Sequence, residues 1–202
     1  MQRSLAGGRL TFLGSFPRKV PLQALPEVAV AGRSNVGKSS CLNRLVGVKQ
    51  AARVSSTPGR TQAINLFQVE QRYILADLPG YGFAKVPEGV QRAWKGLVEG
   101  YLSDERDLRL VILLVDPRRE PGGMDADLLW SLRETRIPVQ VVATKIDKLT
   151  RAQARTALAR LATAYGVRPD DLIGFSALKG DGVEELDRAI AKAVARSRGP
   201  ER

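Results

Sequence analysis

Two glycines five positions apart, followed by a lysine and a serine, form the motif with the clearest chemistry in this sequence. Gly32-x-x-x-x-Gly37-Lys38-Ser39 has the spacing of a Walker A phosphate-binding loop. The glycines let backbone amides curl around phosphate oxygens, where a Cβ atom would interfere. Lys38 can reach the β- and γ-phosphates as a point charge, and Ser39 can offer its hydroxyl to Mg²⁺. We therefore predict that the loop holds a nucleoside di- or triphosphate.

Two later segments, each at the end of an apolar run, indicate the base. They are TKID (residues 144–147) and FSALKG (residues 175–180). Asp147 can accept hydrogen bonds from N1–H and the 2-amino group of guanine, and adenine does not offer this pair of donors. The aliphatic stem of Lys145 can lie along the base, while backbone amides of the second segment can donate to guanine O6. Either segment alone also fits an ordinary solvated loop, but together and in this order they predict a guanine nucleotide.

A third motif, DLPG, also ends an apolar run and concerns the terminal phosphate. Asp77 can hold Mg²⁺ through a water molecule, and the Gly80 amide can reach the γ-phosphate. Between this motif and the phosphate loop, Thr61 is placed to close on Mg²⁺ only when a γ-phosphate is present. Thr61 is also compatible with an ordinary loop, so its candidacy depends on its position. We predict switch segments over 49–63 and 78–92.

The elements that must position these loops are indicated by apolar runs that alternate with amphipathic stretches. The runs predict strands over 27–33, 64–69, 73–77, 110–116, 139–144 and 172–175. Apolar residues at helical spacing predict three helices, marked by Val90, Trp94, Leu97 and Tyr101, by Ala154, Leu158, Leu161 and Tyr165, and by Val183, Leu186 and Ile190. Strands joined through helices form a mostly parallel sheet with helices on both faces.

Two of the predicted strands, 64–69 and 73–77, are too close for a crossover connection. We predict a hairpin through 70–72, which makes one edge strand antiparallel. The expected fold class is therefore α/β, a three-layer P-loop nucleotide-binding fold with a mostly parallel six-stranded sheet. Residues 47–63 have no clear periodicity and are predicted to form a mobile loop.

Positive charge gathers at both ends of the chain, which has 202 residues and a formal net charge of +11. We predict a basic extension over 1–26, a nucleotide-binding domain over 27–197 and a flexible tail over 198–202. The first segment has basic residues and no acid, and basic residues outnumber acids after Leu186. Such ends suit a polyanion, either RNA or an anionic membrane surface, although solubility alone is the simpler alternative.

The remaining composition is that of a globular protein in a reducing compartment. Cys41 is the only cysteine, so an internal disulfide is impossible, and we expect this residue to be buried. The longest strongly apolar run, Leu110 to Val115, is far shorter than the roughly twenty residues of a membrane span. The N-terminus lacks the apolar core of a signal peptide. We expect a cytoplasmic monomer without membrane insertion.

Taken together, GRSNVGKSS, TPGRTQ, DLPGYG, TKID and FSA resemble the motifs of translation-factor-related GTPases of the TRAFAC class, whose fold is Ras-like. TPGRTQ paired with DLPGYG, with Trp94, Tyr101 and Asp116-x-Arg118, resembles the EngB (YihA/YsxC) family from about Leu10 to Ala195. The resemblance implies a GTPase that assists assembly of the large ribosomal subunit and is needed for normal cell division and septation. It implies GTP, GDP and Mg²⁺ as ligands, and the large subunit or its rRNA as partner of the basic ends.

The resemblance also carries a site onto this chain. It implies catalytic roles for Lys38, Thr61, Gly80 and Asn35, and magnesium ligation by Ser39 and Thr61, with Asp77 acting through water. The implied nucleotide-binding positions are Gly32, Arg33, Ser34, Asn35, Val36, Gly37, Lys38, Ser39, Gly59, Arg60, Thr61, Gln62, Ala63, Asp77, Leu78, Pro79, Gly80, Thr144, Lys145, Ile146, Asp147, Ser176, Ala177 and Leu178.

Two residues bear on the rate of hydrolysis. Tyr81 follows DLPG, where Ras-like enzymes place a glutamine that orients the attacking water. A tyrosine has no amide, so we expect slow intrinsic hydrolysis, at or below about 10⁻³ s⁻¹. Asn35 resembles the asparagine with which related GTPases coordinate K⁺ near the β- and γ-phosphates. Asparagine also suits a tight turn, and the sequence leaves both roles open.

Three functions compete at this stage. The leading hypothesis is a molecular switch that binds and hydrolyses GTP and contacts ribosomal RNA. The alternative is a nucleotide-gated interaction module at the division machinery, for which hydrolysis is secondary, and Tyr81 keeps this alternative open. A nucleotide kinase or an ATPase would share the phosphate loop but not the TKID and FSA pair.

Overall fold

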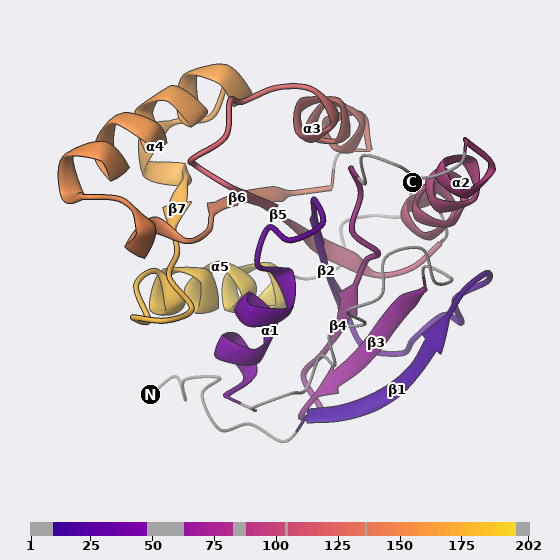
Figure 1. Ribbon diagram of the computed structural model, residues 1–202. Coiled ribbons are helices and arrows are strands. Elements are labelled where there is room, and N and C mark those ends of the chain that lie inside the picture. Colours follow the sequence, from indigo (N-terminus) through magenta and orange to yellow (C-terminus); the bar gives the residue numbers. More distant parts are fainter. Residues whose placement is uncertain (1–9, 48–62, 83–87, 104, 136, 197–202) are drawn as a thin grey trace.

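The computed structural model describes residues 10–47, 63–82, 88–103, 105–135 and 137–196, which are coloured in Figure 1. Within these residues, one seven-stranded sheet has the order β1-β3-β4-β2-β5-β6-β7. Its strands are β1 (Leu10–Phe16), β2 (Glu27–Gly32), β3 (Ile64–Val69), β4 (Tyr73–Asp77), β5 (Leu108–Val115), β6 (Val139–Ala143) and β7 (Ile173–Gly174). The helices are α1 (Lys38–Val46), α2 (Glu88–Ser103), α3 (Met124–Glu134), α4 (Arg151–Tyr165) and α5 (Val183–Ala195), with short 3₁₀ turns η1 (Ile146–Lys148) and η2 (Pro169–Asp171).

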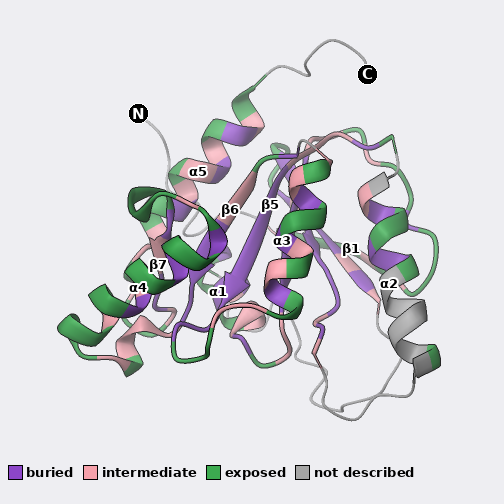
Figure 2. Ribbon diagram, turned by 90° about the horizontal axis from the view of Figure 1, so that it is seen from above, coloured by how far each residue is buried: buried purple, intermediate pink, exposed green. Residues whose placement is uncertain are grey.

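Helices cover both faces of the sheet, and the side-chain alternation of β2 shows why. Ala29 and Ala31 join a core with α2, α3 and α4, whereas Val28 and Val30 join a core with α1 and α5. Successive residues of a strand point to opposite faces, so a strand buried on both faces must be apolar throughout. Figure 2 shows the central strands buried and the outer surfaces of the helices exposed. The predicted three-layer, mostly parallel α/β fold is confirmed.

The predicted hairpin is also confirmed. β3 and β4 are antiparallel, with Val69 opposite Tyr73. The N–H of Arg72 donates to the carbonyl of Val69 over 3.2 Å and closes the turn. Glu70 takes a positive φ of 52° there. The hairpin leaves β4 parallel to β2, so the DLPG motif emerges at the same edge of the sheet as the phosphate loop.

The prediction of six strands with β3 at the edge was wrong. β1 lies outside β3, pairs with it in antiparallel fashion and forms the true edge of the sheet. The register shifts between Phe12 and Gly14, so the stretch LTFLGSF lacks the alternation that marks a half-buried strand. β1 therefore places part of the predicted N-terminal extension within the sheet.

The three helices predicted from periodicity correspond to α2, α4 and α5, and α1 is the helix expected after the phosphate loop. The remaining helix, α3, had no counterpart among the predicted elements. The buried face of α3 consists of Leu129, Leu132 and the carboxylic acid Asp125. A hydropathy pattern assigns an aspartate to the solvent face, so the periodicity of this short helix is lost.

Two smaller expectations concern burial and membrane crossing. Cys41 lies on the buried face of α1 and belongs to the core, as predicted. In the parts of the chain that the structure describes, no helix has both the length and the apolar character needed to cross a bilayer. The loop predicted over 47–63 falls almost entirely outside the described residues, and the tail over 198–202 does so completely.

Candidate functional site

The phosphate loop connects β2 to α1 and is shaped by close packing. A Cβ at Gly32 would lie 2.9 Å from Cγ1 of Val36 and 3.0 Å from the carbonyl oxygen of Leu114, so only glycine fits there. Asn35 and Gly37 both take left-handed backbone conformations, with φ of 63° and 107°. These reversals turn the loop into the N-terminus of α1, where the helix has no side-chain cap and no acid in its first turn. Free amides and a positive dipole end make this a site for an anion.

Opposite charges meet beside the loop. The Lys38 ammonium forms an ion pair with Asp77 at the end of β4, and both side chains are largely shielded from solvent. The other oxygen of Asp77 accepts a hydrogen bond from Asn65 Nδ2 over 3.3 Å. The structure therefore brings together the lysine and the aspartate that the sequence selected, and Asn65 is a neighbour that sequence reasoning missed.

The DLPG segment packs directly on the phosphate loop. The N–H of Leu78 donates to the carbonyl of Val30 over 3.0 Å, and the N–H of Ser34 donates to the carbonyl of Tyr81 over 2.8 Å. A Cβ at Gly80 would lie 3.1 Å from Ser34 Oγ and 3.3 Å from Ser34 Cα. Glycine at position 80 thus lets the two backbones approach each other beside the phosphate loop, at the rim of the candidate anion site.

The Tyr81 side chain turns away from this rim. It is 3% exposed, and its hydroxyl donates to Asp125 Oδ1 of α3 over 2.7 Å. Burial raises the pKa of Tyr81 strongly, and the Asp125 carboxylate adds to the effect. The phenol therefore stays protonated and belongs to the core. Asp125 had no signal in the sequence, because nothing in its local pattern indicated that it is buried.

The TKID segment is tied to the phosphate loop. Thr144 Oγ1 donates to the carbonyl of Val36 over 2.6 Å, inside the core. Lys145, which has a φ of 57°, donates to the carbonyl of Asn35 and lies 3.4 Å from Asp116 Oδ2. These contacts set the position of the candidate base site relative to the candidate phosphate site.

The FSA segment meets the same place from the neighbouring strand. Ser176 is fully buried, and its hydroxyl donates to Asp147 Oδ1 over 2.8 Å. The N–H of Ile146 donates to the carbonyl of Phe175 over 3.3 Å. Leu178, by contrast, is 75% exposed. The two predicted base-reading segments therefore converge at the carboxyl ends of β6 and β7, where ligands commonly bind in open α/β sheets.

Asp116, at the end of β5, links the base-reading segment to a further arginine. It accepts hydrogen bonds from Arg118 N at 3.1 Å, Nε at 2.9 Å and Nη2 at 2.7 Å. Burial raises its pKa, but the hydrogen bonds and charge of Arg118, with the charge of Lys145, outweigh it and lower the pKa to about 2. The sequence pointed to the Asp-x-Arg motif only through the family resemblance. Asp116 follows a buried apolar run, as Asp77 does, and this position is the signal that could have selected it.

Two of the predicted magnesium ligands, Ser39 and Asp77, lie at the start of α1 and beside it. Ser39 lies in the first turn of α1, one residue after Lys38, whose ammonium meets Asp77. No cluster of three His, Cys, Asp or Glu suited to a metal occurs within the described residues. One hydroxyl and one carboxylate do suit Mg²⁺, which keeps several waters and takes other ligands from phosphates. Gly59, Arg60, Thr61 and Gln62 lie outside the described residues, whereas Ala63 is half-buried just before β3.

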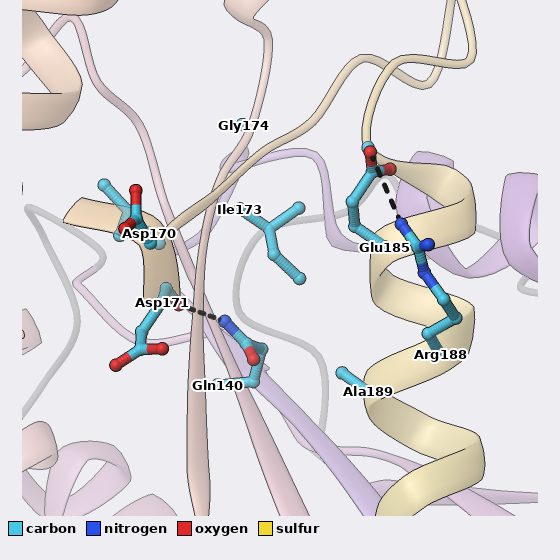
Figure 3. Close-up of a pocket in the computed structure, with 10 residues that line it drawn as sticks. Gln140, Asp170, Asp171, Ile173, Gly174, Glu185, Arg188 and Ala189 are labelled. Atoms are coloured by element: carbon cyan, nitrogen blue, oxygen red, sulfur yellow. Dashed lines mark hydrogen bonds and ion pairs between the residues drawn. The ribbon is translucent and has the colours of Figure 1, made fainter. Parts of the chain in front are cut away.

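A separate cavity lies beside β7, as Figure 3 shows, with a volume of about 370 Å³. Several of its polar side chains bond to one another or to neighbours: Asp171 pairs with Arg168, Gln140 donates to the carbonyl of Asp171, and Glu185 lies 3.8 Å from Arg188. It has none of the phosphate-loop features, so the loop cluster at the ends of β2, β4, β6 and β7 is the candidate site.

Comparisons with known proteins agree with this geometry. Residues 27–145 match the family model described as 50S ribosome-binding GTPase. The probable GTP-binding protein EngB of Geobacter metallireducens is 48% identical over 182 residues, which cover 90% of this chain and 89% of that protein. The chain belongs to the EngB family. The family resemblance predicted from the motifs is therefore confirmed.

Solved structures place the EngB-family chain among P-loop GTPases. The crystal structure of a probable GTP-binding protein EngB superposes with a TM-score of 0.69 and 28% identity, covering 83% of this chain and 98% of that one. Era of Aquifex aeolicus, bound to GDP and AlF₄⁻, gives a TM-score of 0.68 at 22% identity, with coverage of 89% and 60%. The likeness to Era concerns the fold alone.

Proposed function

We propose that this EngB-family protein binds GTP and GDP with Mg²⁺, hydrolyses GTP to GDP and phosphate, and acts as a nucleotide-dependent switch during large ribosomal subunit assembly. One observation carries the proposal. Ser176 Oγ lies 2.8 Å from Asp147 Oδ1, and the Lys145 ammonium donates to the carbonyl of Asn35 in the phosphate loop. A carboxylate that selects guanine is thereby held in a fixed position relative to the amides that would bind the phosphates.

The phosphate end of the proposed site depends on the start of α1. Its uncapped amides and the Lys38 ammonium together provide hydrogen-bond donors and positive charge for a polyphosphate. Lys38 is held by Asp77 at this place, so its charge lies beside the loop. Gly80 packs against Ser34, and we infer that its amide would recognise the third phosphate, which only the triphosphate has.

Ser39 and Asp77 fit a magnesium ion bound mainly through water and phosphate, and Thr61 is the proposed third ligand. The ion would neutralise charge on the β- and γ-phosphates when bound. Asp77 is oriented for this role by Asn65, which donates to the oxygen that does not face Lys38.

Hydrolysis would transfer the γ-phosphoryl group to water. The water oxygen forms a bond to phosphorus, the bond to the β–γ bridging oxygen breaks, and one water proton is released. Tyr81 cannot orient that water, because its hydroxyl is turned into the core toward Asp125. Slow intrinsic turnover follows, with stimulation by K⁺ at Asn35 or by a group from the ribosomal partner.

The ribosomal part of the proposal is supported by exposed basic residues at both ends of the described chain. Arg18 and Lys19 follow β1, and Arg188 and Lys192 lie on α5. Phosphate-rich rRNA would bind such residues in a salt-dependent way. We place the cell-division role downstream, since defective ribosome supply would disturb division. The alternative is a nucleotide-gated module at the division machinery, favoured only by the inward turn of Tyr81.

Exchange of the base tests the nucleotide site. In Asp147→Asn, the side-chain amide can donate to the C2 carbonyl of xanthine but repels the 2-amino group of guanine. GDP affinity should fall about 100-fold, the loss of two charge-assisted hydrogen bonds, while xanthosine diphosphate should gain affinity. Asp170→Asn, an exposed carboxylate on η2, serves as the matched control and should bind GDP normally. Unchanged GDP binding in Asp147→Asn would contradict the proposal.

A pelleting assay tests the ribosomal partner. The protein with a non-hydrolysable GTP analogue should co-sediment with large subunits more than the protein with GDP. Charge reversal at Arg188 and Lys192 should weaken this binding, and added salt should weaken it further. Equal binding with both nucleotides would count against a switch, and localisation at the septum without ribosome binding would favour the alternative.

A further inference from the structure

Tyr81 is anchored at both its backbone and its side chain. Its carbonyl accepts from the N–H of Ser34 in the phosphate loop over 2.8 Å, and its hydroxyl donates to Asp125 Oδ1 on α3 over 2.7 Å. Tyr81 and Asp125 are 3% and 5% exposed. The residue after Gly80 therefore ties the phosphate loop to a helix that carries none of the predicted nucleotide-binding residues.

An arginine of the phosphate loop completes this buried cluster. Arg33 pairs with Tyr81 as an isolated parallel bridge, and within the described residues its Nε is buried without a hydrogen-bond partner. Burial is the main influence on the pKa of Asp125 and raises it, whereas the Tyr81 hydrogen bond and the charges of Arg33 and Arg119 lower it. A Cβ at Gly82 would lie 3.0 Å from Arg33 Nε. The guanidinium thus fills the space next to Gly82, and its charge partly offsets the effect of burial on the pKa of Asp125.

This cluster limits the movement of Gly80. The glycine packs so closely on Ser34 that a Cβ would come within 3.1 Å of its hydroxyl. Tyr81, the next residue, is held by a buried hydrogen bond that would have to break before the Gly80 peptide could rotate away. Buried polar groups keep their partners because an unsatisfied group is costly. The Gly80 amide therefore keeps one orientation as long as Asp125 holds Tyr81.

We propose that Asp125 is a positioning residue: by holding Tyr81 in the core, it fixes the Gly80 amide toward the terminal phosphate and so sets the preference for GTP over GDP. The inference rests on the proposed function, since it concerns the third phosphate of that ligand. It gives α3 a role in distinguishing the two nucleotides, although the helix carries none of the predicted nucleotide-binding residues.

The fold contains a matched control for this cluster. At the opposite end of β2, the Tyr101 hydroxyl donates to Glu27 Oε2, and Arg106 Nη1 lies 3.0 Å from both carboxylate oxygens. The Arg106 guanidinium also stacks over the Tyr101 ring at 4.1 Å. Both clusters contain a buried hydrogen bond from a tyrosine to a carboxylate and a nearby arginine, but here the arginine pairs directly with the acid, and the cluster lies at the start of β2 rather than at the phosphate loop. Removing the Tyr101 hydroxyl therefore shows the effect of losing a buried hydrogen bond that has no role at the nucleotide site.

The test compares affinities for GDP and for a non-hydrolysable GTP analogue in full-length wild type, Tyr81→Phe, Asp125→Ala, Asp125→Asn and Tyr101→Phe. Tyr81→Phe keeps the ring in the core and removes only the hydroxyl. In Tyr81→Phe and Asp125→Ala, the preference for the analogue should fall about tenfold, or about 1.4 kcal/mol, with little change for GDP. Asp125→Asn keeps an acceptor oxygen and should restore most of the preference. Tyr101→Phe should lower the melting temperature without changing the preference for the analogue over GDP.

Three outcomes would overturn the inference. The first is an unchanged preference in Tyr81→Phe. The second is an equal loss of affinity for both nucleotides, which would mean that the cluster shapes the whole phosphate loop. The third is a change of the same size in Tyr101→Phe. A wild-type protein that bound neither nucleotide would overturn the proposed function, and this inference with it. Normal binding with an unchanged preference would overturn this inference alone.

Discussion

Ser176 donates its hydroxyl hydrogen to Asp147 across 2.8 Å, so a serine at the end of β7 orients the carboxylate that follows β6. Ser176 is fully buried, and its oxygen also accepts from the N–H of Lys179 over 3.0 Å. The hydroxyl thus joins the turn after β7 to the acid that the proposal assigns to guanine. We expect an indirect effect on affinity, because the hydroxyl holds the acid in one orientation.

Ser176→Ala should weaken GDP and GTP binding to the same extent, about five- to tenfold, because Asp147 loses its orienting donor while its charge remains. Calorimetry with both nucleotides measures the change. Ser131→Ala, an exposed serine on α3, is the control and should bind as wild type does. Full affinity in Ser176→Ala would mean that Asp147 is oriented without this hydroxyl.

Thr144→Val should lower the free energy of unfolding by about 1–3 kcal/mol, because the carbonyl of Val36 loses its donor inside the core. Nucleotide binding should weaken as well, since the hydrogen bond braces the phosphate loop. Urea unfolding measures the stability. Thr156→Val makes the same exchange on exposed α4, where the hydroxyl donates to the carbonyl of Ala152 over 3.2 Å, and should cost much less. Equal losses of stability in the two variants would show that burial of the hydrogen bond makes no difference.

The parts of this molecule that could be predicted from sequence are those with local patterns. The buried parallel strand β2 is apolar from Val28 onward, and the packing at its last residue, Gly32, requires a glycine. Asp77 and Asp147 could also be selected as site residues, because each lies at or just after the end of such an apolar run. Residues 49–62, which include Thr61, lie outside the described residues, so the role of this segment stays a prediction.

The features that could not be predicted depend on contacts between distant residues. β1 lacks alternation and gains its place only by pairing with β3. Asp125 looks like a surface residue of a short helix until Tyr81 and Arg33 are placed against it. Tyr81 stands where Ras-like enzymes have a glutamine, and no local pattern indicates that its hydroxyl faces α3.

Asp116→Asn should reduce the dependence of stability on pH in the acid range. The folded-state pKa of Asp116 is about 2, below its ordinary value of 3.8, so its ionised form stabilises the fold. This contribution is fully present above pH 3.8 and is lost as the pH falls toward 2. Urea unfolding across that window should give a shallower slope for Asp116→Asn than for wild type. Asp127→Asn, an exposed acid of α3, is the control, and an equal change there would contradict the assignment.

Asn35→Gly separates the two roles that Asn35 can have. The left-handed φ of 63° is one that glycine adopts freely, so the substitution preserves the turn and removes only the side-chain amide. If the amide coordinates K⁺ near the phosphates, wild-type GTP turnover should be about tenfold faster in KCl than in NaCl, because the ion stabilises transition-state charge. Asn35→Gly should lose this stimulation while keeping its affinity for GDP. Asn35→Asp, which keeps an oxygen and adds charge, shows whether the amide itself is needed. Identical wild-type rates in the two salts would leave the turn as the sole reason for an asparagine at this position.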